Sequence, residues 1–571
     1  YKYMLAYHGK NNLTNFDSLL YKLNFLEDFG EWHLVQLVYG ITVNEHTGQP
    51  LKLRAEEFSP DNYGAITYHK SVMLLLALEW LLGEDVFQKG INTYFARWNG
   101  KHPTHEDFFN IMEEVSGKDL EWFVEEWYNK TSYSDFKIVK TKTEKHDNKF
   151  ITEIYVNNKG TMKGMPAPVQ LVTSSNDTIA GRWSGNKEQP VEITHTDPAK
   201  KIEVNLNRVI YESNYLNNTT IPDFDINFLA QFPRFDTYAI NLLPYFWHES
   251  YKDKFRLGIG FWSGNPFFKH YFAHGSFYYG TGSGNIGYDF NITNRYNSFF
   301  SNFIDVGATI KDMDGLKRYS VELKSVSINP EDSRYHYLFK LNFDNVKLYD
   351  MAYNDHSVFQ KTRYSTISLT FFNKFRRMLY YYNTQLSVEK ALDILDSETN
   401  FTKAEFEFFY KRYLTKKSQI KFRLYGAGLW GSDIPNQELI YSGGDTDPKH
   451  KRFALGRRGA EAPLRIWTFN SKMNMPGYSD TDNPYRAGRA GASMRFEYKR
   501  EPFPAIYAAG GSISTTIDDF GKDYIAEYGL ILGGDNLHFV FPIYVTDPSP
   551  DEKHVAFRFQ FNFKIPINIS Y

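Results

Sequence analysis

The chain contains no cysteine, no long uninterrupted hydrophobic run and no block of basic residues. The lack of cysteine excludes a disulfide framework and says little about the cellular compartment. The longest apolar run, Val72–Leu82, is interrupted by Glu79 and is too short to cross a bilayer as a helix. A formal net charge of -2 does not indicate nucleic-acid binding. The mean hydropathy of -0.50 would by itself indicate a soluble protein.

The stretch Val555–Tyr571 shows a strict alternation that changes this interpretation. Its odd positions are all apolar, and its even positions are polar except for Ala556 and Pro566. A period of two places side chains on alternate faces of a strand. Soluble strands average about 5–6 residues, whereas a tilted membrane strand needs about 9–11. The stretch therefore predicts the closing strand of an outer-membrane barrel, with an edge strand of a soluble sandwich as the alternative.

The same alternation recurs from Asp236 to the end of the chain. Between Tyr335 and Asp344, for example, the odd positions are aromatic or aliphatic and most even positions are polar. Half of each barrel strand faces a polar lumen, so hydropathy does not reveal such proteins. Residues 236–571 are therefore predicted to form a transmembrane antiparallel β-barrel of about 16 strands. The predicted strands start near residues 237, 253, 269, 284, 299, 315, 335, 364, 379, 402, 418, 488, 503, 522, 536 and 555.

The parity of the connections predicts an orientation. An even number of strands puts both ends of the barrel on the face with short turns. The long interruptions 347–363 and 429–487 are the seventh and eleventh connections, so they are expected opposite the N-terminal domains. These domains are expected in the periplasm, with the long loops extracellular or folded into the lumen. Since an outer-membrane protein needs export, we expect residues before Tyr1 to have been removed or to be missing.

The N-terminal 132 residues read as helices. Apolar residues recur at helical spacing over 84–98. Thr104 is a suitable N-cap for the next helix, with Asp107 at the capping-box position and Gly117 at its end. Short alternating strands then predict a small β-sandwich over 133–213, and 214–235 reads as a linker. The fold class is thus multidomain α+β, with a helical domain, a sandwich and a barrel.

The helical part resembles the zinc aminopeptidases of the aminopeptidase N type. The resemblance rests on Tyr68-His69-Lys70-Ser71, on the Leu-rich run that ends in Leu82-Gly83, and on the segment PTHEDFFNIMEEVSGKDLEWFVEEWY. It covers roughly residues 1–215 and implies that Tyr68 stabilises the tetrahedral oxyanion opposite a zinc ion. A phenol near a metal-polarised carbonyl can donate to the oxygen that gains charge. Ser71 stands where the family has glycine, and the alternative is that Tyr68 is a core aromatic residue.

The zinc ligands that this resemblance implies are not present in the sequence. The family holds zinc with a His-Glu-x-x-His helix and a later glutamate, and no His-Glu-x-x-His occurs here. His105-Glu106 has no second histidine after it and reads as a helix start. The ligands are therefore expected upstream of Tyr1; otherwise the domain is an inactive peptidase. Zinc remains the expected cofactor, and whether the chain is a metallo-aminopeptidase stays open.

The barrel resembles the sixteen-stranded family of BamA-like assembly barrels and two-partner secretion transporters. Its eleventh connection contains Gly443-Gly444 and Arg457-Arg458-Gly459. In that family an Arg-Gly-aromatic motif of the sixth extracellular loop folds into the lumen, whereas Ala460 replaces the aromatic residue here. The resemblance implies that Arg458 enters the lumen and pairs with an inward acid. The alternative is an ordinary solvated basic loop.

Two functions follow from these resemblances. In the first, the protein is an outer-membrane metallopeptidase whose periplasmic aminopeptidase-like domain cleaves peptides. In the second, it is a non-catalytic component of outer-membrane protein assembly or secretion, in which the barrel and the peptidase-like scaffold bind partner proteins. The expected partners are outer-membrane lipid and either peptide substrates or other outer-membrane and periplasmic proteins. Nucleic acid is not expected.

Overall fold

The computed structural model describes residues 31–571 except for a set of short segments. The segments left out are 207, 229–234, 250–251, 265–270, 330–334, 357, 378, 446, 452–468, 479–486, 534–536, 549–552, 559 and 564–571. The chain divides into two compact units, and each is described by itself. One contains the chain up to Leu242 with residues 263–272 and 330–333, and the other contains the remainder.

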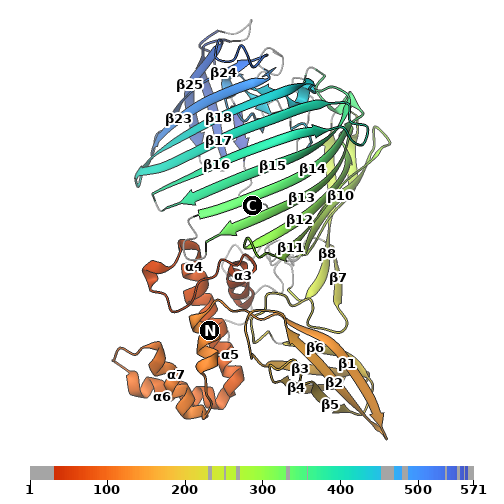
Figure 1. The fold of residues 1–571 in the computed structure, drawn as a ribbon, viewed down its shortest axis with the longest axis vertical. Helices are drawn as coiled ribbons and strands as arrows, with labels where there is room; N and C mark the ends of the chain where they lie inside the picture. Colours follow the sequence, from red (N-terminus) through yellow and green to blue (C-terminus); the bar gives the residue numbers. More distant parts are fainter. Residues whose placement is uncertain are drawn as a thin grey trace. The chain divides into compact units, whose positions relative to one another are not determined.

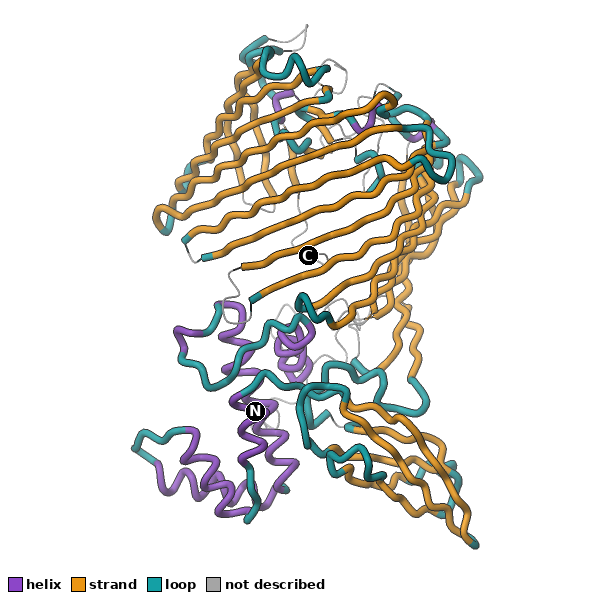
Figure 2. The backbone as a smooth tube through the Cα atoms, in the orientation of Figure 1, coloured by secondary structure: helices purple, strands orange, loops and turns teal. Residues whose placement is uncertain are grey.

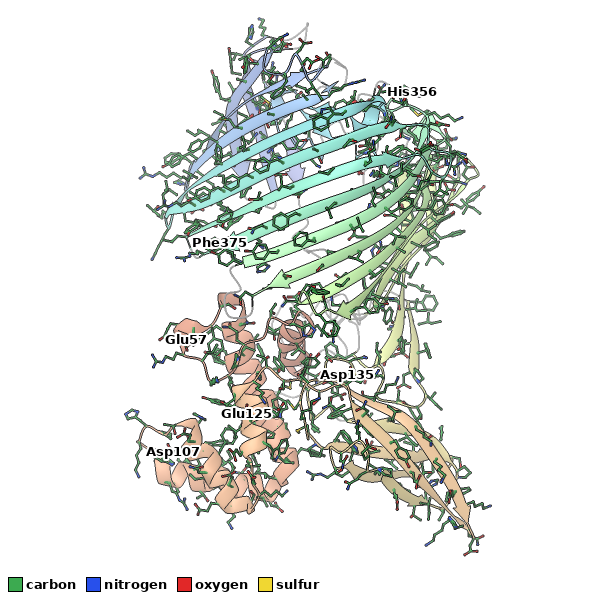
Figure 3. All side chains as sticks on the ribbon, in the orientation of Figure 1. Glu57, Asp107, Glu125, Asp135, His356 and Phe375 are labelled. Atoms are coloured by element: carbon green, nitrogen blue, oxygen red, sulfur yellow. The ribbon has the colours of Figure 1, made fainter. Side chains whose placement is uncertain are left out.

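The first unit begins with helices that the sequence patterns explain (Figure 1). They are α3 (Glu31–Asn44), η1 (Ala55–Glu57), α4 (Pro60–Gly64), η2 (Ala65–Lys70), α5 (Ser71–Leu82), α6 (Glu84–Trp98), α7 (His105–Ser116), α8 (Glu121–Val124) and η3 (Glu125–Asn129). The predicted capping box of α7 is confirmed. The backbone N–H of Asp107, labelled in Figure 3, donates to the Thr104 hydroxyl at 3.4 Å, and Asp107 accepts from the Thr104 backbone N–H at 2.8 Å. Gly117 ends this helix in the left-handed region at φ 67°.

Residues Asn62–Leu82 form a helical run that is longer than the apolar stretch within it. By length and composition this 21-residue run, with a hydropathy of 1.3, could cross a membrane. The sequence expectation, based on Val72–Leu82 alone, did not include this possibility. Half of the most apolar 18-residue segment of this run is buried inside the protein, and Met73, Ala77 and Leu78 lie in the hydrophobic core. We therefore interpret the run as a core helix.

Two three-stranded sheets follow the helices. Their orders are β1-β2-β5 and β4-β3-β6, and the strands are β1 (Phe136–His146), β2 (Lys149–Asn158), β3 (Ala167–Thr173), β4 (Thr178–Trp183), β5 (Val191–His195) and β6 (Ala199–Val204). One hydrophobic core runs without a break from the helices into these sheets, from Val35 to Tyr211. The Arg182 guanidinium also lies 4.5 Å from the centroid of the Trp80 ring. The helices and sheets therefore pack as one body.

A strand lies within the range that the sequence suggested to be a linker. This strand, β7 (Asp223–Phe228), pairs in parallel with the beginning of β8 (Thr237–Glu249). Residues 214–235 thus include a sheet element.

The large sheet contains sixteen further strands, and their starts follow the predicted series. They are β8, β9 (Lys254–Gly264), β10 (Tyr271–Gly280), β11 (Ile286–Asn297), β12 (Phe303–Met313), β13 (Leu316–Ile328), β14 (Tyr335–Leu348), β15 (Thr362–Arg376), β16 (Tyr380–Leu392), β17 (Asn400–Thr415), β18 (Ser418–Asp433), β23 (Ala490–Arg500), β24 (Ala505–Ser514), β25 (Tyr524–Gly533), β26 (Leu537–Val545) and β27 (Gln560–Phe563). Figure 2 shows these strands in orange. Neighbours in sequence are neighbours in the sheet, and the strand order is that of a barrel, with β7 between β27 and β8.

The large sheet exposes its apolar side chains on one face and buries its polar side chains on the other, the reverse of a sheet in a soluble protein. In β14, Tyr337, Phe339 and Leu341 are 37%, 51% and 44% exposed, whereas Asn342 and Asp344 are 2% and 0% exposed. The predicted alternation of this strand is therefore confirmed, with its apolar side chains on the outer face and its polar side chains on the inner face.

The predicted closing strand is described only in part. Gln560–Phe563 forms β27 and pairs with β26, and Tyr544 makes an isolated bridge to Val555. Ala556–Arg558 are described and lie outside any strand, so the predicted strand that starts at Val555 is wrong over these three residues, whereas residues 559 and 564–571 lie outside the described residues.

Candidate functional site

Tyr68 lies in η2, a six-residue π-helical segment between α4 and α5. Such segments are rare and occur frequently at functional sites. The Ser59 hydroxyl caps α4 by accepting from the backbone N–H of Asn62 at 3.2 Å. Pro60 follows at the first helical position, where its missing N–H costs no hydrogen bond. The start of the helix that carries Tyr68 is thus determined by its own sequence.

A buried polar network holds the chain before this helix. The Asn62 side-chain amide donates to the Thr47 carbonyl at 2.6 Å and to Oε1 of Gln49 at 3.1 Å. The same Gln49 oxygen accepts from the backbone N–H of Ser59 at 2.9 Å. Each of these four residues is buried. Because an unsatisfied buried amide is costly, this network orients the turn from which η2 begins.

The side chain of Tyr68 is 63% exposed, so the alternative reading as a core aromatic residue is wrong. Its ring meets that of Tyr63 edge to face, with centroids 6.2 Å apart, and Tyr63 contacts Phe58 in the same way at 6.2 Å. Within the described residues, the Tyr68 hydroxyl makes no hydrogen bond. A phenol held on one side by aromatic contacts, with its hydroxyl open to solvent, is able to donate to an incoming oxygen.

Lys70 takes the opposite side of the same segment. It is 1% exposed, and its Nζ donates to the carbonyl oxygen of Lys130 at 2.8 Å, just beyond η3. Burial lowers the pKa of Lys70 from its ordinary value of 10.5 to about 7. Lys70 lies two residues after Tyr68, about half a helical turn away, so the two side chains are on different faces. Lys70 thus links the two π-helical segments through this hydrogen bond, which indicates a structural role.

The residues that the structure describes do not fit a zinc site. The part of the chain that the structure describes contains no group of three or more His, Cys, Asp or Glu side chains that could hold a metal ion. Burial lowers the pKa of His69, next to Tyr68, and so favours its neutral imidazole. Among the described residues, however, His69 belongs to no group of side chains that could hold a metal ion. The expected zinc therefore has no ligand set among the described residues.

The second site lies on the inner face of the large sheet, where the eleventh connection inserts. Lys449 of this connection is buried, and its Nζ contacts Oδ2 of Asp344 on β14 at 3.3 Å, the Thr366 hydroxyl on β15 at 2.9 Å and the carboxylate of Glu389 on β16. Asp344 also accepts from Nε of Arg318 at 2.7 Å. A lysine from a loop is thus held by side chains of three neighbouring strands.

Other described parts of the eleventh connection are held in the same way. Lys472 pairs with Glu405 of β17. The Arg495 guanidinium donates to the carbonyl of Asn474 at 3.1 Å, and the backbone N–H of Gly477 donates to Glu527 at 2.7 Å. The buried residues Met473, Met475 and Tyr478 join an apolar cluster with inward side chains. The expectation that a long loop folds into the lumen is thereby met for Lys449 and for residues 472–478.

The predicted loop motif falls on a part of the chain that the structure leaves out. Arg457, Arg458 and Gly459 lie outside the described residues. The expected pairing of Arg458 with an inward acid therefore stays a prediction, while Lys449, Lys451 and Lys472 of the same connection do pair with acids of the sheet.

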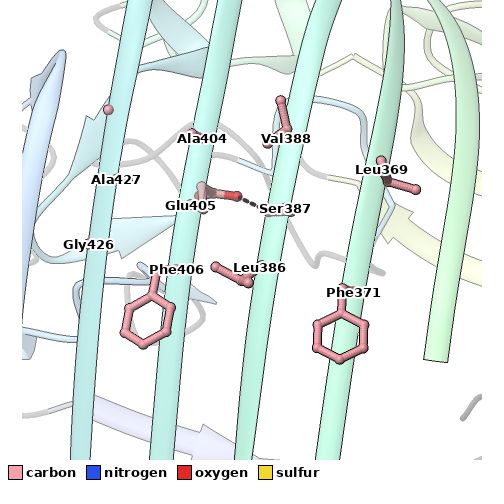
Figure 4. A pocket seen from close by; sticks show the side chains of 11 residues that line it. Leu369, Phe371, Leu386, Ser387, Val388, Ala404, Glu405, Phe406, Gly426 and Ala427 are labelled. Atoms are coloured by element: carbon pink, nitrogen blue, oxygen red, sulfur yellow. Dashed lines mark hydrogen bonds between the residues drawn. The ribbon is translucent and has the colours of Figure 1, made fainter. Parts of the chain in front are cut away.

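A groove of about 380 Å³ lies across β15–β18 (Figure 4). It is lined mainly by apolar side chains of the outer face, including Leu369, Phe371, Leu386 and Phe406, and by the glycines of β18. Glu405 borders the groove, but it accepts from Ser387, Tyr425 and Lys472. Because these contacts engage the carboxylate of Glu405, that residue is not a free acid for catalysis, and the groove offers an apolar surface.

Comparison with known proteins separates the two parts of the chain. Residues 40–127 match the peptidase family M1 domain. Within this region the chain is 36% identical over 83 residues to aminopeptidase N of Haemophilus influenzae, and 38% identical over 69 residues to that of Escherichia coli. These alignments cover 14% and 12% of this chain, and only 9% and 8% of the relatives. The chain therefore spans less than a tenth of the length of these two relatives.

Two solved structures show weak similarity. Aminopeptidase A of Legionella pneumophila, in complex with aspartic acid, aligns with a TM-score of 0.21 and 16% identity over 26% of this chain and 17% of its own. BamA of Haemophilus ducreyi, lacking POTRA domains 1–3, aligns with a TM-score of 0.32 and 11% identity over 81% of this chain and 93% of its own. At these scores the strand pairing described above remains the basis for the barrel. The chain joins an aminopeptidase-like segment to a large barrel-type sheet.

The sequence patterns did not reveal Lys449 or Lys70 as buried cations. Lys449 lies in a loop without periodicity, so no pattern distinguishes it from its neighbours Lys451 and Arg452. The acids on the inner face could be predicted in part, because Asp344 lies at one of the even, mostly polar positions of its strand.

Proposed function

We propose that the protein is an integral outer-membrane β-barrel that carries an aminopeptidase-like domain. The observation that supports membrane insertion most directly is the inverted polarity of the large sheet. Val321, Leu369, Val388 and Ile506 are all more than half exposed, whereas charged side chains on the opposite face are buried. Contiguous exposed apolar surface on this scale marks a membrane or protein interface. Outward apolar and inward polar residues are the arrangement of a membrane barrel.

A pair of arginine substitutions on β16 tests this proposal. Leu386 lies at the middle of the strand on the outer face, whereas its neighbour Gln385 faces inward and is paired in register with Glu407. An arginine on the lipid face at the mid-plane costs roughly 2–4 kcal/mol. Leu386→Arg should therefore reduce the folded fraction in vesicles, measured as the heat-modifiable band on unboiled gels. Gln385→Arg can pair with Glu407 and should fold nearly as well as the wild type. Equal losses for the two variants would contradict the assignment of faces.

We place the N-terminal domains in the periplasm. The support for this orientation is the position of the long connections. The seventh and eleventh connections both leave the sheet at the end opposite the one where β8 begins, and in outer-membrane barrels the longer loops are extracellular. Protease added to intact cells should then leave the N-terminal domains uncut until the outer membrane is permeabilised. Cleavage of these domains in intact cells would reverse the orientation.

The aminopeptidase-like segment is proposed to bind peptides at the face that carries Tyr68. Its solvent-exposed hydroxyl can donate a hydrogen bond to a peptide carbonyl oxygen, and the adjacent rings of Tyr63 and Phe58 provide an apolar wall. In aminopeptidases of this family zinc supplies Lewis-acid activation of the carbonyl. The residues that the structure describes do not provide ligands for zinc, so the role proposed for this face is the binding and orientation of a peptide.

A second candidate is a non-catalytic role in outer-membrane protein assembly or secretion. The strand number of the large sheet and the eleventh connection that contacts its inner face support it. Metal analysis and peptide hydrolysis by the full-length protein separate the two. Stoichiometric zinc with hydrolysis of amino-terminal residues supports a peptidase, whereas neither zinc nor hydrolysis supports the non-catalytic role.

A further inference from the structure

The groove across β15–β18 follows from a step in side-chain size between paired strands. Two successive rows of residues in register line it: Leu369, Val388, Ala404 and Gly428, and then Phe371, Leu386, Phe406 and Gly426. Figure 4 shows Phe371, Leu386 and Phe406 on three neighbouring strands. Both rows end in a glycine on β18, so the outer face is hollowed there.

The two glycines differ in what lies over them. A Cβ at Gly426 would meet no atom within 4 Å, so the groove is open above this residue. A Cβ at Gly428 would lie 2.7 Å from Cη2 of Trp430, which places the indole ring beside this glycine. Side chains that line an open space lack contacts on one side and lose dispersion attraction unless a ligand fills it. Because the lining is apolar and does not hold water, that ligand must be apolar too.

A cation and an indole ring lie at one end of the groove. The next row in register, toward the strand ends from which the long connections leave, contains Lys390, Thr402 and Trp430. Lys390 is exposed, two residues or about 7 Å beyond Val388. Its Nζ lies 3.4 Å from Oδ1 of Asn400, and Trp430 is 48% exposed. Tryptophan and lysine in such positions are typical of the membrane–water interface.

We propose that this groove binds one acyl chain of lipid A, with a headgroup phosphate at Lys390. The proposal rests on the proposed function, because only a barrel inserted in the outer membrane presents this face to lipid. Since the long connections are placed outside the cell, the lysine end of the groove faces the leaflet that contains lipid A, whose phosphates complement the charge of Lys390. The groove volume of about 380 Å³ lies within the range of about 300–1,000 Å³ for small-molecule pockets.

Native mass spectrometry of the full-length protein in detergent tests the groove, with added bisphosphorylated lipid A as the probe. Gly426→Leu fills the open space. Gly510→Leu is the matched control, because Gly510 shares the outer face of β24 with Ile506 and a Cβ there has only ordinary contacts, at 3.8 and 4.0 Å. The wild type and Gly510→Leu should each retain one lipid A, and Gly426→Leu should bind it at least tenfold more weakly. Equal binding by the two variants would overturn the proposal.

Lys390→Gln tests the headgroup contact. This variant should bind lipid A at least fivefold more weakly, whereas Lys347→Gln, which changes an exposed lysine at the same end of β14, should bind it as the wild type does. Phosphatidylglycerol, the second probe, should compete weakly, and competition as strong as that of lipid A itself would refute the choice of lipid.

Heat-modifiable migration of each variant separates loss of the lipid site from failure to insert. A folded wild-type barrel that binds no lipid A would overturn this site and leave the assignment of the membrane face intact. A barrel that does not fold in vesicles would count against the proposed function instead.

Discussion

Replacing Lys449 by methionine should remove the main charged anchor of the eleventh connection. Its Nζ lies among Asp344, Glu389 and Thr366 and is buried. Asp344 keeps Arg318 at 2.7 Å and Lys451 at 3.3 Å, whereas Lys449 is the ion-pair partner described for Glu389. Breaking a buried pair by removing one partner costs about 3–5 kcal/mol, because the remaining charge is left uncompensated. We expect a loss of stability within this range.

The measurement is equilibrium unfolding in detergent, followed by tryptophan fluorescence. Lys340→Met is the matched control, because Lys340 pairs with Glu322 on neighbouring strands while both side chains are about one third exposed. That loss should be at most about 1 kcal/mol. Adding Glu389→Gln to Lys449→Met removes the orphaned charge and should restore part of the stability. A loss for Lys449→Met no greater than that of the control would refute the reasoning.

Two further predictions concern the helical domain. Burial lowers the pKa of Lys70 to about 7, so the folded state bears the full cost of the charged amine below about pH 7, and stability should rise from about pH 7 to 10. Lys70→Met should remove this increase in the free energy of unfolding, which amounts to at most about 5 kcal/mol at 1.36 kcal/mol per pKa unit. Replacing the exposed Lys118 by methionine should leave the increase in place. Helix unfolding followed by circular dichroism at 222 nm measures both variants. If the full-length protein hydrolyses peptides, Tyr68→Phe should lower kcat by about 10² to 10³ with KM little changed. Tyr63→Phe should remain near wild-type activity, and equal activity of the two variants would mean that the Tyr68 hydroxyl has no catalytic role.

The strands of the large sheet were predictable because each carries its own signal. Alternation assigns every residue to one face, so the starts of β8–β18 and β23–β27 could be read without knowledge of their neighbours. The capping box at Thr104 and Asp107 is local in the same sense.

Contacts made over long sequence distances could not be predicted in this way. β7 has the alternating pattern Asp-Phe-Asp-Ile-Asn-Phe, but a run of six residues between turn signals does not show whether or where it pairs. Lys449 meets Asp344 across 105 positions, and no local pattern encodes that encounter. The exposure of Tyr68 likewise depends on what packs around its helix.

The shared core of the helices and small sheets has a consequence for how this chain could have been assembled from ancestral pieces. The match to the peptidase family M1 domain covers residues 40–127, and the apolar core continues beyond it through Phe136, Ile154 and Trp183 to Tyr211. A recombination point placed between residues 132 and 133 would separate Trp80 from Arg182 and expose both halves of this core. The helices and the small sheets therefore bury this core only together, and a fragment that ended between them would expose the apolar side chains on both sides of the cut.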